Sequence, residues 1–231
     1  MTKRAQLFIA ATILSGCLLL TSSLWEERLF APSSAYLAYC LLALMASGLK
    51  VHLPGITGTI SVNFVFVLIS VAVFTFSETV LLAAVACIVQ CLWKCRRRPR
   101  LIQVSFNVAT LAVSSGAAYR VSHLLAGHTE INLVVLLSVA ACFYFTANTM
   151  LVSGVMALVE GKRLFQVWQQ CYVWSLPYYL VGAIIAGLVV STGQAMGWTA
   201  SLVMLPLAYL VFLFYRMCTD RILALRIASI E

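Results

Sequence analysis

The sequence predicts an all-α membrane protein, a polytopic bundle of transmembrane helices. Two totals support this fold class: 63% of the 231 residues are hydrophobic, and only 10% are charged. Soluble globular domains contain about a quarter charged residues, and the mean hydropathy here is +1.01. Lipid can cover such an apolar surface, whereas water cannot. We therefore expect one membrane domain over residues 1–215 and a helical cytoplasmic tail, or the start of a connector to an output domain, over residues 216–231.

A helix needs about twenty apolar residues to cross a bilayer. Eight segments reach or approach this length, and both termini are expected in the cytoplasm. In chain order the segments are Gln6–Leu24, Ser34–Leu49, Ile56–Phe76, Thr79–Trp93, Leu101–Leu125, Ile131–Val159, Tyr172–Val190 and Thr199–Tyr215. The second and fourth are short, so a count of seven results if one of them is re-entrant. Only Phe76-Ser77-Glu78 joins the third span to the fourth, which predicts a tight helical hairpin.

Basic residues are distributed unevenly between the predicted connections. With the amino terminus in the cytoplasm, thirteen of the fifteen lysines and arginines fall on the cytoplasmic side. Only Arg28 and Arg120 fall outside. Because lysine and arginine concentrate in the cytoplasmic loops of membrane proteins, this asymmetry predicts the orientation independently of hydropathy.

One connection, Cys91–Arg100, holds a third of the basic residues. Its cations are Lys94, Arg96, Arg97, Arg98 and Arg100. On a soluble protein such a cluster would suggest a nucleic-acid site. Between two spans it predicts a membrane-surface anchor that contacts the anionic headgroups of the inner leaflet. We therefore expect lipid headgroups as its partner and no nucleic acid.

Motifs of known enzyme classes are missing from the sequence. The one aspartate, Asp220, lies in the tail, and there is no His-Glu-x-x-His, no phosphate-binding glycine loop and no nucleophile-elbow serine motif. Cys87, Cys91 and Cys95 share one helical face at a spacing of four, whereas structural zinc ligands are often separated by two residues. We interpret these cysteines as packing residues and expect no catalytic residues, no cofactor and no metal.

Hydrogen-bonding side chains within the spans are the candidates for a ligand site, because polar groups in a membrane interior are expensive unless paired or functional. Four predicted helices place such groups at a similar depth in the inner half of the membrane. The candidate ligand-binding residues are Asn63, Asn107, Asn148, Thr149, Tyr178 and Tyr179. Hydrogen bonding between helices is the alternative interpretation, with about 0.6–2 kcal/mol for each bond in lipid.

Three further features of the sequence are candidates for a functional role. Pro177 falls inside the seventh span, where it would kink the helix, either as a hinge or to fit its neighbours. Arg120 and His123 lie one turn apart near the outer end of the fifth span. Either Arg120 extends to headgroups or to a local glutamate, or the two form an anion-binding or proton-sensing pair. Leu164–Gln170 is expected to lie as a helix on the membrane surface.

Several short motifs resemble the membrane-associated sensor (MASE-type) domains of bacteria. These motifs are Gly48–Phe64, Ser105–Asn107, Asn148–Leu151, Glu160-Gly161 with Trp168 following, and Leu176–Leu180. The resemblance covers roughly residues 40–215. Such domains are commonly found upstream of cytoplasmic GGDEF or HD-GYP output domains, whose residues do not occur here. The resemblance implies a sensory module of the bacterial inner membrane that has a cytoplasmic output domain or protein as its partner.

We therefore predict a non-catalytic sensory or input domain that binds a small or lipid-like signal within the bundle and shifts its last helix. A second copy of the chain is a further candidate partner. The alternative is a transporter of small solutes or lipids, or the substrate-binding membrane subunit of one. Paired broken helices in the two halves of the chain would favour transport. The only internal similarity of this kind is a weak one between Ser61–Phe64 and Ser105–Val108.

Neutralising the basic loop tests the predicted orientation. Changing Arg96, Arg97, Arg98 and Arg100 together to glutamine should weaken the preference for a cytoplasmic loop, because most of the charge that retains it is removed. Reporter fusions on both sides of the fourth and fifth predicted spans measure the orientation. An unaltered topology would contradict the anchor role.

Overall fold

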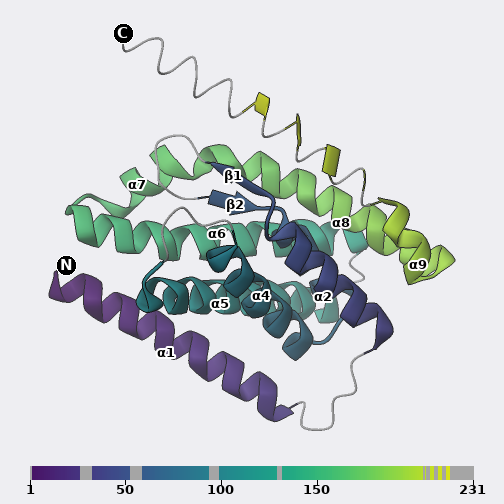
Figure 1. Ribbon diagram of the computed structural model, residues 1–231, viewed down its shortest axis with the longest axis horizontal. Coiled ribbons are helices and arrows are strands. Elements are labelled where there is room, and N and C mark those ends of the chain that lie inside the picture. Colours follow the sequence, from purple (N-terminus) through teal and green to yellow (C-terminus); the bar gives the residue numbers. More distant parts are fainter. Residues whose placement is uncertain are drawn as a thin grey trace.

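A computed structural model describes most of the chain and shows a bundle of helices (Figure 1). The described residues are 2–26, 33–52, 59–93, 99–128 and 132–204, with short pieces at 206, 209–210, 213–214 and 217–218. The loop cations Lys94, Arg96, Arg97 and Arg98 lie outside the described residues. So do parts of the predicted eighth span (205, 207–208, 211–212 and 215) and nearly all of the predicted tail.

Within the described residues, four helices are long and apolar enough to cross a membrane. They are α1 (Lys3–Glu26), α5 (Leu101–His128), α6 (Leu133–Glu160) and α8 (Leu176–Met196). The shortest of the four, α8, has 21 residues. At about 1.5 Å per residue it measures about 31 Å, close to the hydrocarbon thickness of about 30 Å. The chain is thus an α-helical membrane bundle, as predicted.

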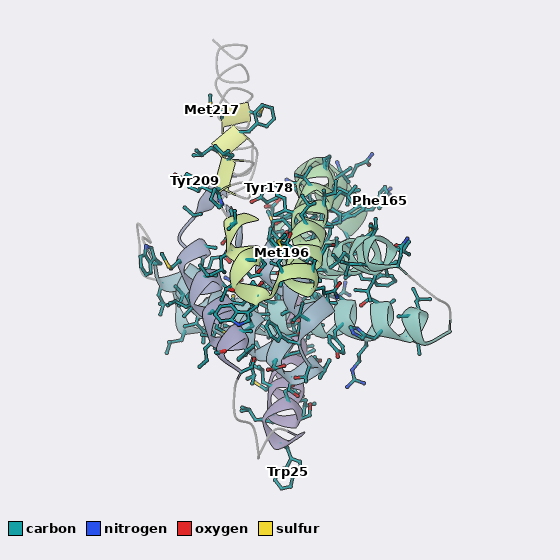
Figure 2. All side chains as sticks on the ribbon, turned by 90° about the vertical axis from the view of Figure 1, so that its right-hand side faces the viewer. Trp25, Phe165, Tyr178, Met196, Tyr209 and Met217 are labelled. Carbon is teal, nitrogen blue, oxygen red and sulfur yellow. The ribbon has the colours of Figure 1, made fainter. Side chains whose placement is uncertain are left out.

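The outer faces of these helices are apolar, as surfaces in contact with lipid should be. Along α1, Leu7, Leu14 and Leu18 are each more than half exposed. Figure 2 shows Trp25 and Phe165 projecting away from the bundle, whereas Tyr178 lies inside it. Exposed aliphatic residues on this scale would be unfavourable in water.

Three shorter apolar helices of the described chain pack with them: α2 (Ser34–Ala46), α3 (Asn63–Val73) and α4 (Phe76–Leu92). With 11 residues, α3 measures about 16 Å, too short to span a bilayer on its own. All of its residues from Asn63 to Val71 are buried, because a helix that is apolar on every side belongs in an interior. It occupies only part of the predicted third span.

Two short strands precede α3, and no pattern in the sequence predicts them. β1 (Lys50–His52) pairs antiparallel with β2 (Thr59–Ser61), with Lys50 opposite Ser61. The pairing provides partners for backbone groups that no helix satisfies, which is a requirement inside a membrane protein. The prediction that helix begins near Ile56 is wrong in this respect, since residues 59–61 are strand.

The predicted hairpin between the third and fourth segments is confirmed, but its turn lies earlier than expected. Only Phe74 and Thr75 separate α3 from α4. The Glu78 carboxylate accepts a hydrogen bond from Thr75 N at 2.8 Å, and Thr75 Oγ1 accepts one from Glu78 N at 3.2 Å. This capping box explains how Glu78 can be almost fully buried.

The second half of the chain contains several short elements. After α6, Gly161 adopts a left-handed conformation with φ 69°, which ends the helix as the sequence predicts. α7 (Leu164–Cys171) confirms the short helix expected there, and η1 (Val173–Ser175) leads into α8. Pro177 sits in the first turn of α8, where its missing N–H has no cost. The predicted kink inside a span is therefore wrong. α9 (Trp198–Ser201) and η2 (Leu202–Met204) follow α8.

The long helices lie side by side, with α5 and α6 between α1 and α8 (Figure 1). Thr2 Oγ1 donates a hydrogen bond to Leu158 O at 3.2 Å, so α1 begins beside the end of α6. The short connection after His128 makes α5 antiparallel to α6. Five described cations therefore share one end of the bundle, which we call the basic end. They are Lys3, Arg4, Arg100, Lys162 and Arg163.

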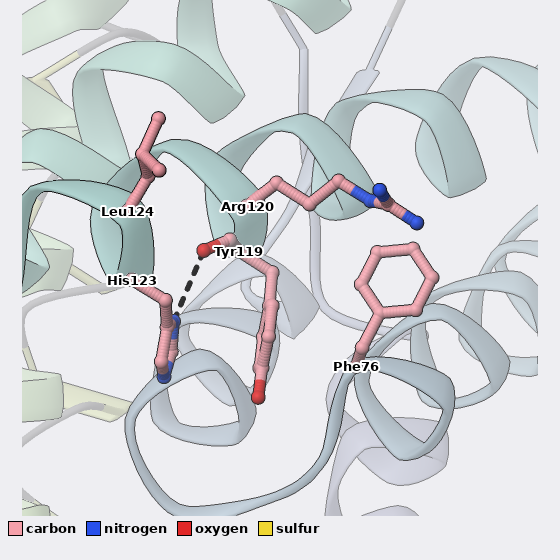
Figure 3. A pocket seen from close by; sticks show the side chains of 5 residues that line it. All are labelled: Phe76, Tyr119, Arg120, His123 and Leu124. Carbon is pink, nitrogen blue, oxygen red and sulfur yellow. Dashed lines mark hydrogen bonds between the residues drawn. The ribbon is translucent and has the colours of Figure 1, made fainter. Parts of the chain in front are cut away.

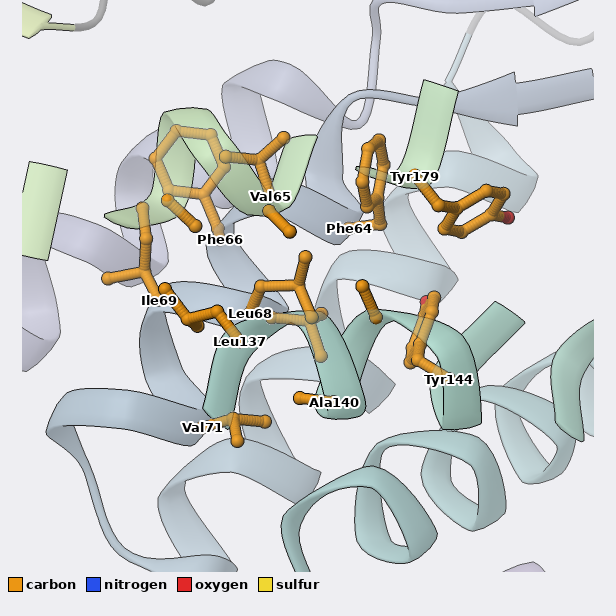
Figure 4. Close-up of a cluster of buried hydrophobic side chains, with 14 of the residues drawn as sticks. Phe64, Val65, Phe66, Leu68, Ile69, Val71, Leu137, Ala140, Tyr144 and Tyr179 are labelled. Atoms are coloured by element: carbon orange, nitrogen blue, oxygen red, sulfur yellow. The ribbon is translucent and has the colours of Figure 1, made fainter. Parts of the chain in front are cut away.

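Small residues permit the closest helix contacts. A Cβ atom added at Gly16 of α1 would overlap Ala109 of α5, and one added at Gly182 of α8 would overlap the ring of Phe64 in α3. Membrane helices associate through small residues in this way. Phe64 lies with Leu68 in the apolar core between α3, α6 and α8 (Figure 4).

Adding one methyl group at Gly182 should destabilise the bundle. Gly182→Ala would force α8 away from Phe64, and overpacking of this kind costs about 1–3 kcal/mol. The free energy of unfolding in mixed detergent micelles measures the effect. Gly187→Ala on the same helix is the matched control, because its Cβ would lie 3.5 Å from Leu137 Cδ1, an ordinary contact. Equal stability of the two variants would contradict the close packing of α8 on α3.

Candidate functional site

A small cavity lies at the start of α3, where α4, α6 and α8 also meet. Its volume is about 50 Å³. Six of its lining residues carry hydrogen-bonding side chains, and we call it the polar chamber. The lining residues are Ser61, Asn63, Phe64, Gln90, Leu111, Tyr144, Asn148 and Tyr179.

The strand pair and α3 hold one side of the chamber. Ser61, the last residue of β2, donates from Oγ to Ala46 O of α2 at 3.1 Å and accepts from Asn63 N at 3.3 Å. Asn63 Nδ2 donates to Gln90 Oε1 of α4 at 3.1 Å. Three helices and the strands are thereby joined by hydrogen bonds that do not compete with water in a lipid environment.

Three of the six predicted ligand-binding residues line the chamber: Asn63, Asn148 and Tyr179. The other three lie elsewhere. Asn107 Nδ2 donates to Cys91 Sγ at 3.4 Å between α5 and α4. Tyr178 packs against Phe64, with ring centroids 5.0 Å apart. Thr149 faces α7. The predicted layer of polar side chains therefore contains both a cavity and contacts between helices.

Five of the eight lining residues were not among the predicted ones, and three of these five carry hydrogen-bonding side chains: Ser61, Gln90 and Tyr144. Gln90 has an amide side chain within the apolar helix α4. The three asparagines were predicted on this same criterion, so it could also have identified Gln90. Tyr144 lies four residues before Asn148 and therefore on the same face of α6. Its side chain is 2% exposed. Tyrosine is common in apolar sequence as a packing residue, so Tyr144 carries a weaker signal on its own.

The chamber is suited to a small polar occupant. The Asn148 amide makes no hydrogen bond with any described residue, and an unpaired amide in an apolar setting is costly. A cavity of this size and polarity can hold ordered water. Pockets for organic ligands measure about 300–1,000 Å³, so a larger molecule could enter only if the helices moved apart.

Thr149 links the chamber region to α7. Trp168 Nε1 of α7 donates to Thr149 Oγ1 at 2.9 Å, and the same hydroxyl donates to Phe145 O at 2.7 Å. The Phe145 ring lies 6.2 Å from Trp168 and 5.2 Å from Tyr179. Aromatic and hydrogen-bond contacts thus run without interruption from the chamber to α7.

Arg120 and His123 line a separate, open groove of about 610 Å³ between α4 and α5 (Figure 3). The Arg120 guanidinium lies 4.6 Å from the centroid of the Phe76 ring. Arg120 forms no ion pair with any described residue, Glu26 and Glu78 included. Glu27 and Glu130, the other carboxylates expected near it, lie outside the described residues.

The predicted cysteine face is only partly described. Cys87 is buried, Cys91 contacts Asn107, and Cys95 lies outside the described residues. In the part of the chain that the structure describes, no three His, Cys, Asp or Glu side chains are grouped so as to hold a metal ion. Of the loop cations only Arg100 is described. Its backbone N donates to Gln103 Oε1 at 2.9 Å at the start of α5.

A double-mutant cycle tests the bond between α3 and α4. Asn63→Ala and Gln90→Ala should show a coupling energy of about 0.5–1.5 kcal/mol, the usual net value of one buried hydrogen bond. Unfolding free energies of the single and double variants give the coupling. Asn63→Ala with Gln103→Ala is the control pair and should be additive, since Gln103 bonds to Arg100. An additive result for Asn63 and Gln90 would refute the bond.

Comparison with protein-family models, with curated proteins and with solved structures finds no match to this chain. The similarity to MASE-type sensor domains therefore rests on the short motifs alone and stays a prediction. The described residues form an α-helical membrane bundle with a polar chamber inside it and a basic groove on its side.

Proposed function

We propose that the chain is a non-catalytic sensory or input domain of the bacterial inner membrane, with the polar chamber as the place where its signal acts. One observation carries this proposal. Side chains from β2, α3, α4, α6 and α8 converge on the same polar cavity. A bundle held together by apolar packing alone would not need such a cavity, because each unpaired polar group in it is costly.

The proposed topology has eight predicted spans and cytoplasmic termini. The grouping of Lys3, Arg4 and Lys162 at the basic end supports it, since positive charge favours the cytoplasm. α2 and α3 run in opposite directions. Tyr36 OH near the start of α2 donates to Glu78 O beside the α3–α4 turn at 3.1 Å, while the end of α2 contacts Ser61. In the proposed topology the termini share a side whether this pair crosses the membrane fully or enters and returns.

The proposed mechanism is a shift between two helix arrangements. The chamber as described admits only small occupants, so a larger signal would have to stabilise a wider arrangement in which α8 or α6 has moved. A signal changes an equilibrium only through its different affinity for the two states. Tyr179 and Phe145 would transmit the change to Trp168 on α7, and α8 would carry it towards the carboxyl-terminal part of the chain.

A transporter of small solutes is the second candidate, and α3 is the observation in its favour. Transporter binding sites are often formed by discontinuous helices whose ends point at the substrate. α3 is a short helix within the bundle, its amino-terminal end faces the chamber, and non-helical backbone precedes it. The lipid-transport version is less well supported, because a chamber of about 50 Å³ cannot hold an acyl chain.

Ligand-dependent stability together with flux distinguishes the two functions. The full chain is screened in detergent against small polar solutes, namely amino acids, polyols, sugars and short carboxylic acids. A solute at about 100 times its Kd should raise the free energy of unfolding by about 2.7 kcal/mol. Asn63→Leu combined with Asn148→Leu should abolish this increase. Asn107→Leu, which removes an amide outside the chamber, is the matched control and should retain it.

The same solute is then tested for transport into vesicles that contain the protein. A sensory domain should change hydrogen exchange in α8 without any flux. Protein-dependent flux would establish the transporter instead. If the solute still stabilised the doubly substituted chain, the chamber would not be its site.

A further inference from the structure

The groove between α4 and α5 is a second site with a different chemistry. It is formed by Phe76 at the start of α4 and by Tyr119, Arg120, His123 and Leu124 of α5 (Figure 3). Its volume of about 610 Å³ falls within the range of about 300–1,000 Å³ that is usual for organic ligands. The groove is open to the side of the bundle and lies at the end opposite the basic end, since α5 runs away from Arg100.

Arg120 provides a positive charge that the described protein does not neutralise. Its guanidinium is held over the Phe76 ring at 4.6 Å, an attraction that fixes its position while leaving its N–H groups available. The Glu78 carboxylate, two residues from Phe76, already accepts the Thr75 N–H. An arginine next to lipid is unfavourable unless an anion pairs with it. The groove therefore favours an anionic ligand.

His123 adds a hydrogen-bond acceptor beside this charge. Its ring stacks on Tyr119 at 4.0 Å, and Nδ1 lies 3.0 Å from Tyr119 O. Because a carbonyl oxygen only accepts, Nδ1 carries the proton and Nε2 is an acceptor in the neutral ring. Nε2 has no hydrogen-bond partner among the described residues. It is available to a hydroxyl group of the ligand.

The rest of the groove is apolar and faces lipid. Leu124 is 63% exposed, and the rings of Phe76 and Tyr119 form the wall next to it. Arg120 lies eight residues before the end of α5 at His128, which corresponds to about 12 Å along the helix. An arginine side chain at this depth reaches the level of the phosphates by extending outward. Acyl chains can then lie along Leu124.

We propose that this groove binds an acidic phospholipid with a hydroxylated headgroup, of the phosphatidylglycerol type, from the leaflet at the Trp25 end of the bundle. The phosphate pairs with Arg120, a headgroup hydroxyl donates to His123 Nε2, and an acyl chain covers Leu124 and Phe76. This site is distinct from the inner-leaflet contact expected of the basic loop. It does not depend on the function of the polar chamber.

Native mass spectrometry of the full chain, titrated with phosphatidylglycerol and with phosphatidylcholine, tests the proposal. Arg120→Gln should weaken phosphatidylglycerol binding about tenfold, as expected for loss of a charge-assisted contact, and leave phosphatidylcholine binding unchanged. Arg4→Gln removes one cation from the basic end and is the matched control. His123→Phe keeps the ring stack and should reduce the preference for phosphatidylglycerol over phosphatidic acid, whose headgroup lacks the glycerol hydroxyls.

Several outcomes would overturn the proposal. Equal losses in Arg120→Gln and Arg4→Gln would show a general charge effect. Inorganic phosphate that competes with phosphatidylglycerol at Arg120 would identify a soluble anion as the occupant. If Arg120 pairs with Glu130 instead, Arg120→Gln and Glu130→Gln should destabilise the lipid-free protein equally, with no change in lipid binding. Unfolding temperatures without lipid establish that each variant is folded, and Arg120→Lys, which keeps the charge, should retain part of the affinity.

Discussion

The burial of α3 is the constraint on which the rest of this structure depends. A helix of 11 residues cannot place both ends in water across a bilayer, so at least one end must be satisfied by protein. At its amino-terminal end that role falls to Ser61 and to the strand pair, and at its carboxyl-terminal end to the tight turn into α4. The helices α2, α4, α6 and α8 pack around α3, and their contacts with it exclude lipid. Gly182 allows α8 to approach Phe64 closely enough for this.

The interruption before α3 also explains where polar side chains gather. Where helical backbone stops inside an apolar bundle, its N–H and C=O groups lose their helical partners and must bond to other polar groups. These polar groups occupy space between the helices. Asn63 and Gln90 bond to each other there, and Asn148 and Tyr144 face the space that remains. The polar chamber is thus a consequence of the short helix. Its small volume matters for function, because it allows water or a small solute in the present arrangement and requires helix movement for anything larger.

The two sites differ in how the protein would use them. The chamber is lined by residues of six elements, β2, α3, α4, α5, α6 and α8, so its occupancy is coupled to how the helices pack against one another. The groove at Arg120 lies on the side of the bundle and involves α4 and α5 alone, so a lipid there can bind without rearranging the core. Tyr36, which joins α2 to the carbonyl of Glu78, and Thr75, which caps α4 beside Phe76, hold the turn near this groove. A lipid bound there would therefore brace the α3–α4 turn at the end of the bundle opposite the chamber.

The sequence alone was enough to predict that this protein is a membrane bundle and where its long helices lie. Apolar length and the placement of lysine and arginine are local quantities, and α1, α5, α6 and α8 follow from them. Gly161 ended α6 as expected for the same reason.

Tertiary structure decided which helix faces contact each other. A helix that is apolar on all sides shows no amphipathic pattern. The sequence therefore could not distinguish α3 from a membrane span, and it could not predict that Gln90 lies next to Asn63. Of the six predicted site residues, Asn63, Asn148 and Tyr179 line the chamber, whereas Thr149 bonds to Trp168. The reason is that the rotation of each helix about its axis is set by tertiary contacts such as that of Gly182 with Phe64. The position of Pro177 in the first turn of α8 was equally a matter of where that helix begins, which is decided by the packing of η1 and α7 before it.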